Sequence, residues 1–114
     1  DGFGGVHVGG GAPALLPAIP YFGFDILKDL ELLATGYLVL EGFGGVHVGG
    51  GAPVPTTPTP YFGIDVAADM EMAGPGYYVL DRYGAIHSGN GARAPALPLA
   101  PYFGFLVARD FEIR

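Results

Sequence analysis

Histidine and aspartate, two residue types that bind metals and transfer protons, recur in this chain at a nearly constant spacing. The histidines lie 40 residues apart, at His7, His47 and His87. Aspartates recur in the same way, at Asp29, Asp69 and Asp110. The two sets could form a shared metal site, an acid–base pair or a network of buried hydrogen bonds.

A shared metal ion is excluded by distance if each repeat folds as a small antiparallel sheet. Neighbouring strands lie about 4.8 Å apart, so a histidine two strands away from the inner strand is roughly 10 Å from it. Zinc requires its ligand nitrogens within about 2.1 Å of the metal. We therefore expect no metal site and no cofactor.

A structural role is the interpretation that remains for these residues. A buried polar group is costly unless it forms hydrogen bonds. Pairing a histidine with an aspartate of the Asp29 type would satisfy both groups and tie neighbouring strands together. The alternative is that both sets of side chains lie in solvent.

Three carboxylates, Asp25, Asp29 and Glu31, share one face of an alternating segment. They could act as a general acid–base pair or bind calcium. However, these acidic positions recur from repeat to repeat, whereas an active site usually breaks repeat symmetry. We interpret them as structural or solvated residues.

Two further sets are candidates for binding a ligand. Aromatic side chains that could stack on sugars follow the prolines of each repeat, at Tyr21, Tyr61 and Tyr102. Their repetition favours packing between repeats instead, because aromatic side chains bury large areas. Polar residues unique to the third repeat could form a binding rim, at Arg82, Asn90 and Arg93.

The repetition also defines the organisation of the chain. The first ten residues return as residues 41–50, with Glu41 in place of Asp1, and more loosely as residues 81–90. A period of this length is typical of repeat architectures. We expect one repeat domain over residues 1–114, with units at 1–40 and 41–80 and an incomplete unit at 81–114.

Within a unit the pattern predicts β-strands and no helix. Residues 24–33 alternate between apolar and polar side chains, and residues 37–40 form a continuous apolar run that suits a strand covered on both faces. A glycine-rich turn leads to a third strand at 45–48, and Tyr61 with Phe62 could add a fourth. Several short strands per 40 residues predict an all-β fold made of β-propeller blades, with a β-trefoil as the alternative.

The segment from Gly36 to His47 resembles the tandem repeats of many bacterial, often secreted, proteins. Those repeats read Gly-Tyr-x-Val-Leu-Asp-Gly-aromatic-Gly-Gly-Val-His and carry an aromatic segment before an aspartate, as Pro20 to Asp25 does here. The resemblance implies a stack of propeller-type blades and a location outside the cell or at its surface. It implies no particular activity.

Composition narrows the range of partners. Eleven acidic residues against five basic ones give a net charge of −6, which disfavours nucleic acid as a partner. The chain contains no cysteine, and no apolar stretch approaches the roughly 20 residues of a membrane-spanning helix. We expect no membrane insertion.

These observations predict a non-catalytic scaffold or binding module for a glycan or a protein. The alternatives are a hydrolase or lyase that uses the repeated Asp and His residues in a channel, and a β-trefoil lectin. Because three blades are too few for a ring, we expect a homodimer that closes a six-bladed propeller. One blade per junction between the chains would then lack the strand equivalent to residues 37–40.

Overall fold

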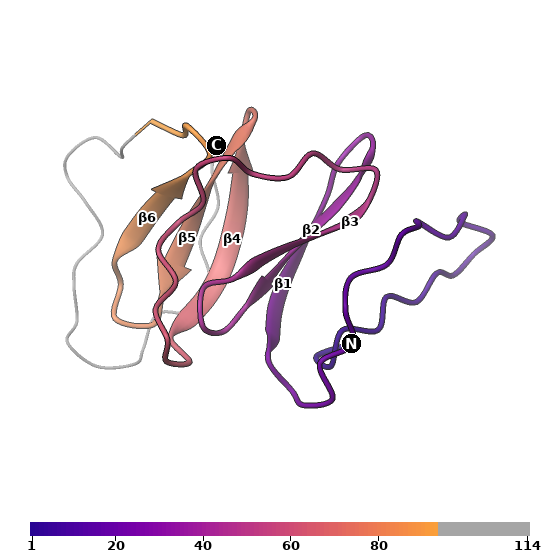
Figure 1. Cartoon of the computed structure of the whole chain (residues 1–114), viewed down its shortest axis with the longest axis horizontal. Coiled ribbons are helices and arrows are strands. Elements are labelled where there is room, and N and C mark those ends of the chain that lie inside the picture. The colour runs from indigo at the N-terminus through magenta and orange to yellow at the C-terminus, as the bar shows by residue number, and fades with distance from the viewer. Residues whose placement is uncertain (94–114) are drawn as a thin grey trace.

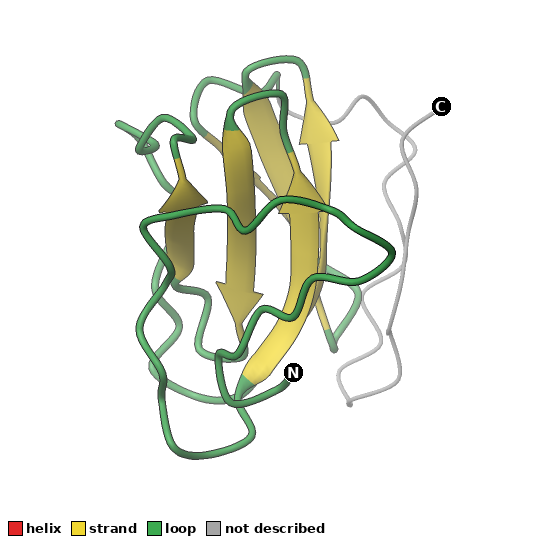
Figure 2. Cartoon of the chain, turned by 90° about the vertical axis from the view of Figure 1, so that its right-hand side faces the viewer, coloured by secondary structure: helices red, strands yellow, loops and turns green. Residues whose placement is uncertain are grey.

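The computed structural model describes residues 1–93, which form β-strands joined by loops and contain no helix (Figures 1 and 2). The strands are β1 (Leu27–Leu32), β2 (Gly36–Glu41), β3 (Val46–Gly50), β4 (Ala67–Ala73), β5 (Gly76–Asp81) and β6 (Ile86–Gly89). The expected all-β class is confirmed. In the described part of the chain, no helix is long and apolar enough to cross a membrane.

The strands form two antiparallel sheets with the same internal order, β1-β2-β3 and β4-β5-β6. Their registers are also the same at an offset of 40 residues: Val39 lies opposite His47 in the first sheet, and Val79 lies opposite His87 in the second. The two sheets stand next to each other in Figure 1 and share no ladder of hydrogen bonds among the described residues. His47 and His87 therefore each lie on the third strand of a sheet, two strands from β1 or β4.

Two details differ from the sequence prediction. The first strand begins at Leu27, and a bulge between Leu27 and Asp29 interrupts its regular alternation. The possible fourth strand is not formed: neither Tyr61 nor Phe62 lies in a strand. Instead, the amide of Phe62 donates a single hydrogen bond of 2.7 Å to the carbonyl oxygen of Phe43.

A chain of backbone hydrogen bonds links the turns of successive repeats. The carbonyl oxygen of Gly2 accepts from the amide of Ile26, whose own carbonyl accepts from Gly42. The same pattern continues from Gly42 to Val66 and from Val66 to Arg82, with distances of 2.8–3.0 Å throughout. The segment before the first strand of each sheet is therefore held between two consecutive turns.

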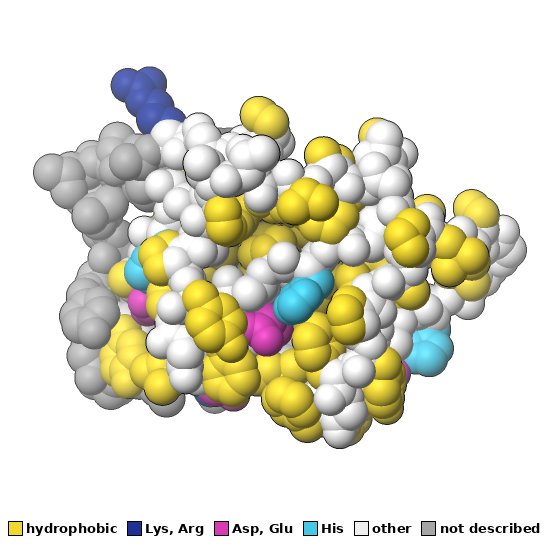
Figure 3. Space-filling view, in the orientation of Figure 1, with side chains coloured by type: hydrophobic (Ala, Val, Ile, Leu, Met, Phe, Trp, Pro, Cys, Tyr) yellow, Lys and Arg dark blue, Asp and Glu magenta, His cyan; other side chains and the backbone are white. Residues whose placement is uncertain are grey.

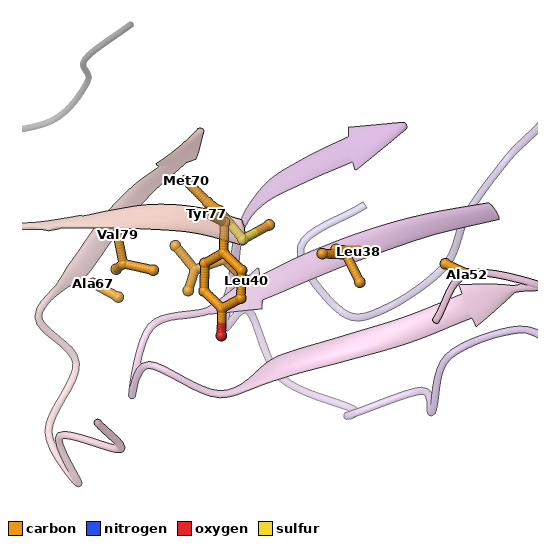
Figure 4. Close-up of a cluster of buried hydrophobic side chains, with 7 residues drawn as sticks. All are labelled: Leu38, Leu40, Ala52, Ala67, Met70, Tyr77 and Val79. Atoms are coloured by element: carbon orange, nitrogen blue, oxygen red, sulfur yellow. The ribbon is translucent and has the colours of Figure 1, made fainter. Parts of the chain in front are cut away.

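The main core lies between the two sheets, where β4 packs against β1 and β2. Leu38 and Leu40 of β2 point toward the second sheet and pack with Ala67, Met70 and Val79 (Figure 4). On its other face, β2 packs through Tyr37 and Val39 against Ile19 of the preceding loop. Every residue of β2 is buried, as the apolar run at 37–40 predicted.

Acidic side chains also meet at this boundary between the sheets. Glu31 of β1 is partly buried near Asp29 on the same strand and Glu71 on β4. Burial, together with these two neighbouring carboxylates, raises the pKa of Glu31 from 4.5 to about 7. The folded chain therefore holds this proton more tightly than the unfolded chain does.

This pKa predicts a pH-dependent loss of stability. Below pH 4.5 Glu31 is protonated in both the folded and the unfolded chain. The free-energy cost of its buried charge develops as the pH rises from 4.5 to about 7. We expect the Glu31→Gln variant to melt a few degrees higher than the parent chain at pH 8. The two proteins should melt alike near pH 4.5, and melting curves that run parallel across the whole pH range would contradict this assignment.

Candidate functional site

The candidate site is the turn between the second and third strands of each sheet, together with the histidine that follows it. In the second sheet the carboxylate of Asp81 is buried and accepts two backbone hydrogen bonds, from Tyr83 at 2.9 Å and from Ala85 at 3.0 Å. Its second oxygen lies 2.9 Å from Nε2 of His87. One carboxylate thus organises the turn and fixes the imidazole six residues later.

The same arrangement occurs in the first turn of the chain. The carboxylate of Asp1 accepts from the amides of Phe3 at 3.0 Å and Gly5 at 2.8 Å, and it lies 2.9 Å from Nε2 of His7. This copy is open to solvent, because the side chain of His7 is 76% exposed. The turn therefore forms even where little covers it.

The middle repeat departs from this arrangement because glutamate replaces aspartate. Glu41 caps the turn through one hydrogen bond of 3.0 Å from the amide of Gly45. Nε2 of His47 is buried and has no hydrogen-bond partner among the described residues. The extra methylene of Glu41 changes the reach of the carboxylate, so that the bond to the histidine is lost.

A phenylalanine ring from the preceding loop contacts the histidine in the second and third copies of this turn. Phe22 lies edge-on to His47 and Phe62 lies edge-on to His87, each with ring centroids 4.9 Å apart. The histidines are spaced across one face of the molecule, with acidic side chains next to them (Figure 3). His87 thus connects its turn to the loop that precedes its own sheet, and His47 contacts the equivalent loop through Phe22.

The structure pairs His7 and His87 with a different carboxylate from the expected one. Asp29 accepts from the amide of Leu30 at 2.8 Å and, across the boundary between the sheets, from the amide of Met70 at 3.0 Å. It therefore ties the first sheet to the second through backbone and not through a histidine. Asp69 occupies the equivalent position on β4, and Asp110 lies outside the described residues.

The contacts of these groups hold each of them in a fixed position. Asp81 accepts three hydrogen bonds, and its partner His87 contacts an aromatic ring on one side. Within residues 1–93, no three histidine or acidic side chains come close enough to hold a metal ion. The arrangement is suited to fixing a turn and positioning a loop.

Asn90, a candidate for the binding rim, has a structural position. Its φ of 51° is left-handed, and the equivalent residue of the first sheet is Gly50, with a φ of 64°. Asparagine is one of the few residues that adopt this conformation readily. Its side chain donates to the carbonyl oxygen of Pro75 at 2.7 Å and accepts from the amide of Thr56 at 3.0 Å, which fixes the proline-rich loop.

The two arginine candidates have different neighbours. Arg82 lies 3.8 Å from Asp65, which Lys28 of β1 also approaches at 3.3 Å. Arg93 is exposed, and its carbonyl oxygen accepts a hydrogen bond from the hydroxyl of Tyr78. The structure does not bring Arg82, Asn90 and Arg93 together as one site.

The aromatic residues that follow the prolines divide into partly buried phenylalanines and exposed tyrosines. Phe22 and Phe62 pack against the histidines, but Tyr21 is 70% exposed and Tyr61 is 65% exposed. The expected packing between repeats is therefore wrong for these two tyrosines, and Tyr102 lies outside the described residues.

Each exposed tyrosine has an aromatic partner from the neighbouring turn. The rings of Phe3 and Tyr21 are 6.4 Å apart and stacked, and those of Phe43 and Tyr61 are 6.3 Å apart and tilted. We name these two pairs the aromatic pairs. They present similar apolar surfaces in successive repeats.

Sequence reasoning overlooked two sets of residues that hold the site together. One is the turn carboxylate, at Asp1, Glu41 and Asp81, whose recurrence six residues before each histidine was a usable signal. The other comprises Tyr37 and Tyr77, which are fully buried and accept hydrogen bonds from the amides of Ile19 and Thr59. Each of these hydroxyl groups pins a proline-rich loop to the middle strand of its sheet.

Comparisons with protein-family models, with curated proteins and with solved structures find no match to this chain.

The turn geometry predicts opposite effects on stability for two substitutions, one from glutamate to aspartate and one from aspartate to glutamate. Glu41→Asp should restore the bond to His47 and raise the free energy of unfolding by about 1 kcal/mol. Asp81→Glu should remove the bond to His87 and lower it by a similar amount. Urea denaturation of the full chain measures both values, and a shift of both variants in one direction would refute the role of the carboxylate.

Proposed function

We propose that this chain is a non-catalytic repeat scaffold of the β-propeller type that binds a neutral polysaccharide through its aromatic pairs. The two three-stranded sheets are successive blades. Their separate ladders, identical registers and face-to-face packing support this arrangement, because the strands of a trefoil would pair across repeats in one barrel.

In this proposal the chain closes into a ring by pairing with a second copy. Repeat units cannot bury their end faces alone, and propellers contain about four to eight blades. Twice three blades falls within that range, and two-fold symmetry is the commonest way to close an assembly. The ring is a homodimer with six blades.

Sedimentation equilibrium tests the ring directly. At micromolar concentration we expect a mass twice the 11.8 kDa of the chain. A single species of 11.8 kDa would contradict the six-bladed ring and favour a closed monomer such as the trefoil.

The observation that carries the binding proposal is the exposure of Tyr21 and Tyr61, which retain 70% and 65% of their accessible surface. Large aromatic side chains are usually buried, so two equivalent exposed tyrosines call for a ligand. Flat aromatic rings suit the apolar faces of sugar rings. The net charge of −6 disfavours anionic ligands, and the spacing in successive repeats suits a chain with repeating units.

This ligand class agrees with the location outside the cell that the repeat resemblance implies. The alternative function, a hydrolase, requires the repeated carboxylates and histidines to lie in one cleft. Asp29 and His87 are instead held by separate partners, a backbone amide and a turn carboxylate. Binding without catalysis is the function that these contacts support best.

Affinity gel electrophoresis with soluble neutral polysaccharides, such as xylan, glucomannan and hydroxyethylcellulose, tests the binding proposal. At least one should retard the parent chain, Tyr21→Ala and Tyr61→Ala should each weaken the retardation, and the double variant should abolish it. Val54→Ala is the matched control, because Val54 is an equally exposed apolar residue outside the aromatic pairs. Retardation that the tyrosine variants leave unchanged, or none with any polysaccharide, would sink the proposal.

A further inference from the structure

Three charged side chains from different segments of the chain meet at Asp65. Asp65 lies in the loop before β4, Lys28 lies on β1, and Arg82 lies in the turn that joins β5 to β6. One oxygen of the Asp65 carboxylate is 3.3 Å from Nζ of Lys28 and 3.8 Å from Nη2 of Arg82. We name these three residues the Asp65 cluster. Two of the three lysine and arginine side chains within residues 1–93 therefore converge on a single carboxylate.

Two backbone hydrogen bonds place this cluster beside the pair formed by Phe43 and Tyr61. The amide of Phe62 donates to the carbonyl oxygen of Phe43 at 2.7 Å, and the amide of Val66 donates to that of Gly42 at 2.9 Å. The segment between these two amides is thus held against the turn at both ends. The tyrosine ring before the first amide and the aspartate before the second therefore lie on the same turn.

Gly42 is the point at which the cluster and the aromatic pair meet. A Cβ atom on Gly42 would overlap the carboxylate of Asp65 and would lie 2.8 Å from Cε of Lys28. Both side chains therefore rest on the glycine that immediately precedes Phe43. A larger residue at this position would displace the cluster from the turn that carries the aromatic ring.

The contacts within the cluster are long and leave it open to a ligand. A strong hydrogen bond from an ammonium or guanidinium group to a carboxylate is about 2.7–2.9 Å long. Nζ of Lys28 lies 3.3 and 3.4 Å from the two oxygens of Asp65, and Arg82 stays beyond hydrogen-bonding distance at 3.8 Å. The side chains of Asp65 and Arg82 are 42% and 32% exposed. Exposed ion pairs of this kind add little to stability.

Two adjacent hydroxyl groups of a sugar match the chemistry of the cluster. Each hydroxyl can donate one hydrogen bond and accept others. The carboxylate of Asp65 can accept from both hydroxyls, while Lys28 and Arg82 can donate to their oxygens. Hydrogen bonds with one charged partner are stronger than those between neutral groups. An anionic ligand suits the cluster less well, because it would meet the carboxylate at its centre.

The arginine distinguishes the second aromatic pair from the first. Asp25 occupies the position of Asp65 in the first repeat, and a Cβ atom on Gly2 would overlap its carboxylate in the same way. The position of Arg82 is taken there by Gly42, which has no side chain. Among the described residues, the aromatic pair therefore recurs and the complete cluster does not. Recurrent stacking can supply affinity, and a single polar cluster can supply selectivity.

We propose that the Asp65 cluster selects the polysaccharide by binding two adjacent free hydroxyl groups of the sugar unit that stacks on Phe43 and Tyr61. Asp65 accepts from the two hydroxyls, and Lys28 and Arg82 donate to their oxygens. The ligand is a neutral glycan whose units keep adjacent hydroxyls unsubstituted. This inference rests on the proposed function, in which the aromatic pairs supply the stacking, and it adds the residues that distinguish one glycan from another.

Affinity gel electrophoresis of the full chain tests this selectivity with xylan and glucomannan, each before and after methylation of its hydroxyl groups. Methylation removes the hydroxyl hydrogens and keeps the sugar ring. We expect it to weaken the affinity of the parent chain at least about tenfold, because a site that hydrogen-bonds a hydroxyl rejects ligands that lack it.

Two variants remove the cluster in different ways. Asp65→Asn keeps the size of the side chain and removes its charge, and Arg82→Gly introduces the residue found at this position in the first repeat. Each should bind the native glycan about tenfold more weakly than the parent chain and should lose most of the discrimination against the methylated form. A general loss of structure would weaken both bindings alike, and melting curves establish that the variants are folded.

Asp25→Asn is the matched control for Asp65→Asn. It changes the net charge by the same amount at the equivalent position of the first repeat, where no arginine is present. It should bind both forms of the glycan like the parent chain. The mobility of each protein in a gel without polysaccharide corrects for its charge.

Three results would overturn the inference and leave polysaccharide binding intact. They are equal retardation of the parent chain by native and methylated glycans, retardation by the partly substituted hydroxyethylcellulose alone, and a folded Asp65→Asn variant with unchanged affinity and selectivity. An absence of retardation by every polysaccharide would overturn the proposed function together with this inference. A loss of binding in Tyr61→Ala without any effect of Asp65→Asn would leave the proposed function standing alone.

Discussion

A sheet of three short strands cannot bury its own apolar faces, and the rest of this structure depends on how that constraint is met. Leu38 and Leu40 reach from the middle strand of one sheet to Met70 on the first strand of the next. Burying such side chains supplies about 1.5–3 kcal/mol each, far more than a surface contact does. Each sheet therefore requires a neighbour, and the repeat period follows from the need to present the same face each time.

The polar contacts between the repeats serve this packing. The backbone chain through Gly2, Ile26, Gly42 and Val66 satisfies peptide groups that the packing would otherwise leave unpaired. Asp29 performs a similar task for the amide of Met70, at the bulge where β1 turns away from regular pairing. These residues recur because the boundary between sheets recurs.

Strand positions could be predicted from the sequence because they depend on local patterns. The buried run at residues 37–40 and the glycine-rich turn after it are visible without any tertiary information. The bulge at Lys28 was not predictable, because alternation is read from side chains and a bulge is a change in backbone pairing. The partner of the histidine was also missed, since choosing between Asp29 and the turn carboxylate requires knowing which way each strand faces.

The tyrosines show where sequence reasoning fails for a physical reason. Tyr21 and Tyr37 are equally apolar, yet one is 70% exposed and the other is fully buried. Tyr37 is buried because a glycine opposite it, Gly49, leaves space for its ring, and its hydroxyl finds the amide of Ile19. That pairing spans two repeats, so no single repeat reveals it. Whether a large residue is buried thus depends on whether the facing strand leaves space for its side chain.

This dependence on the facing element separates two kinds of surface in a repeat protein. A surface such as the aromatic pairs is made within one repeat and its adjoining turn, so it recurs wherever the repeat recurs. A surface such as the face of β4 is made where two sheets meet, so its burial depends on the side chains that the preceding sheet presents. Met70 is fully buried because Leu38 and Leu40 of β2 pack in the same cluster. Each repeat thus contributes one face to the packing between sheets and another to the surface that recurs along the chain.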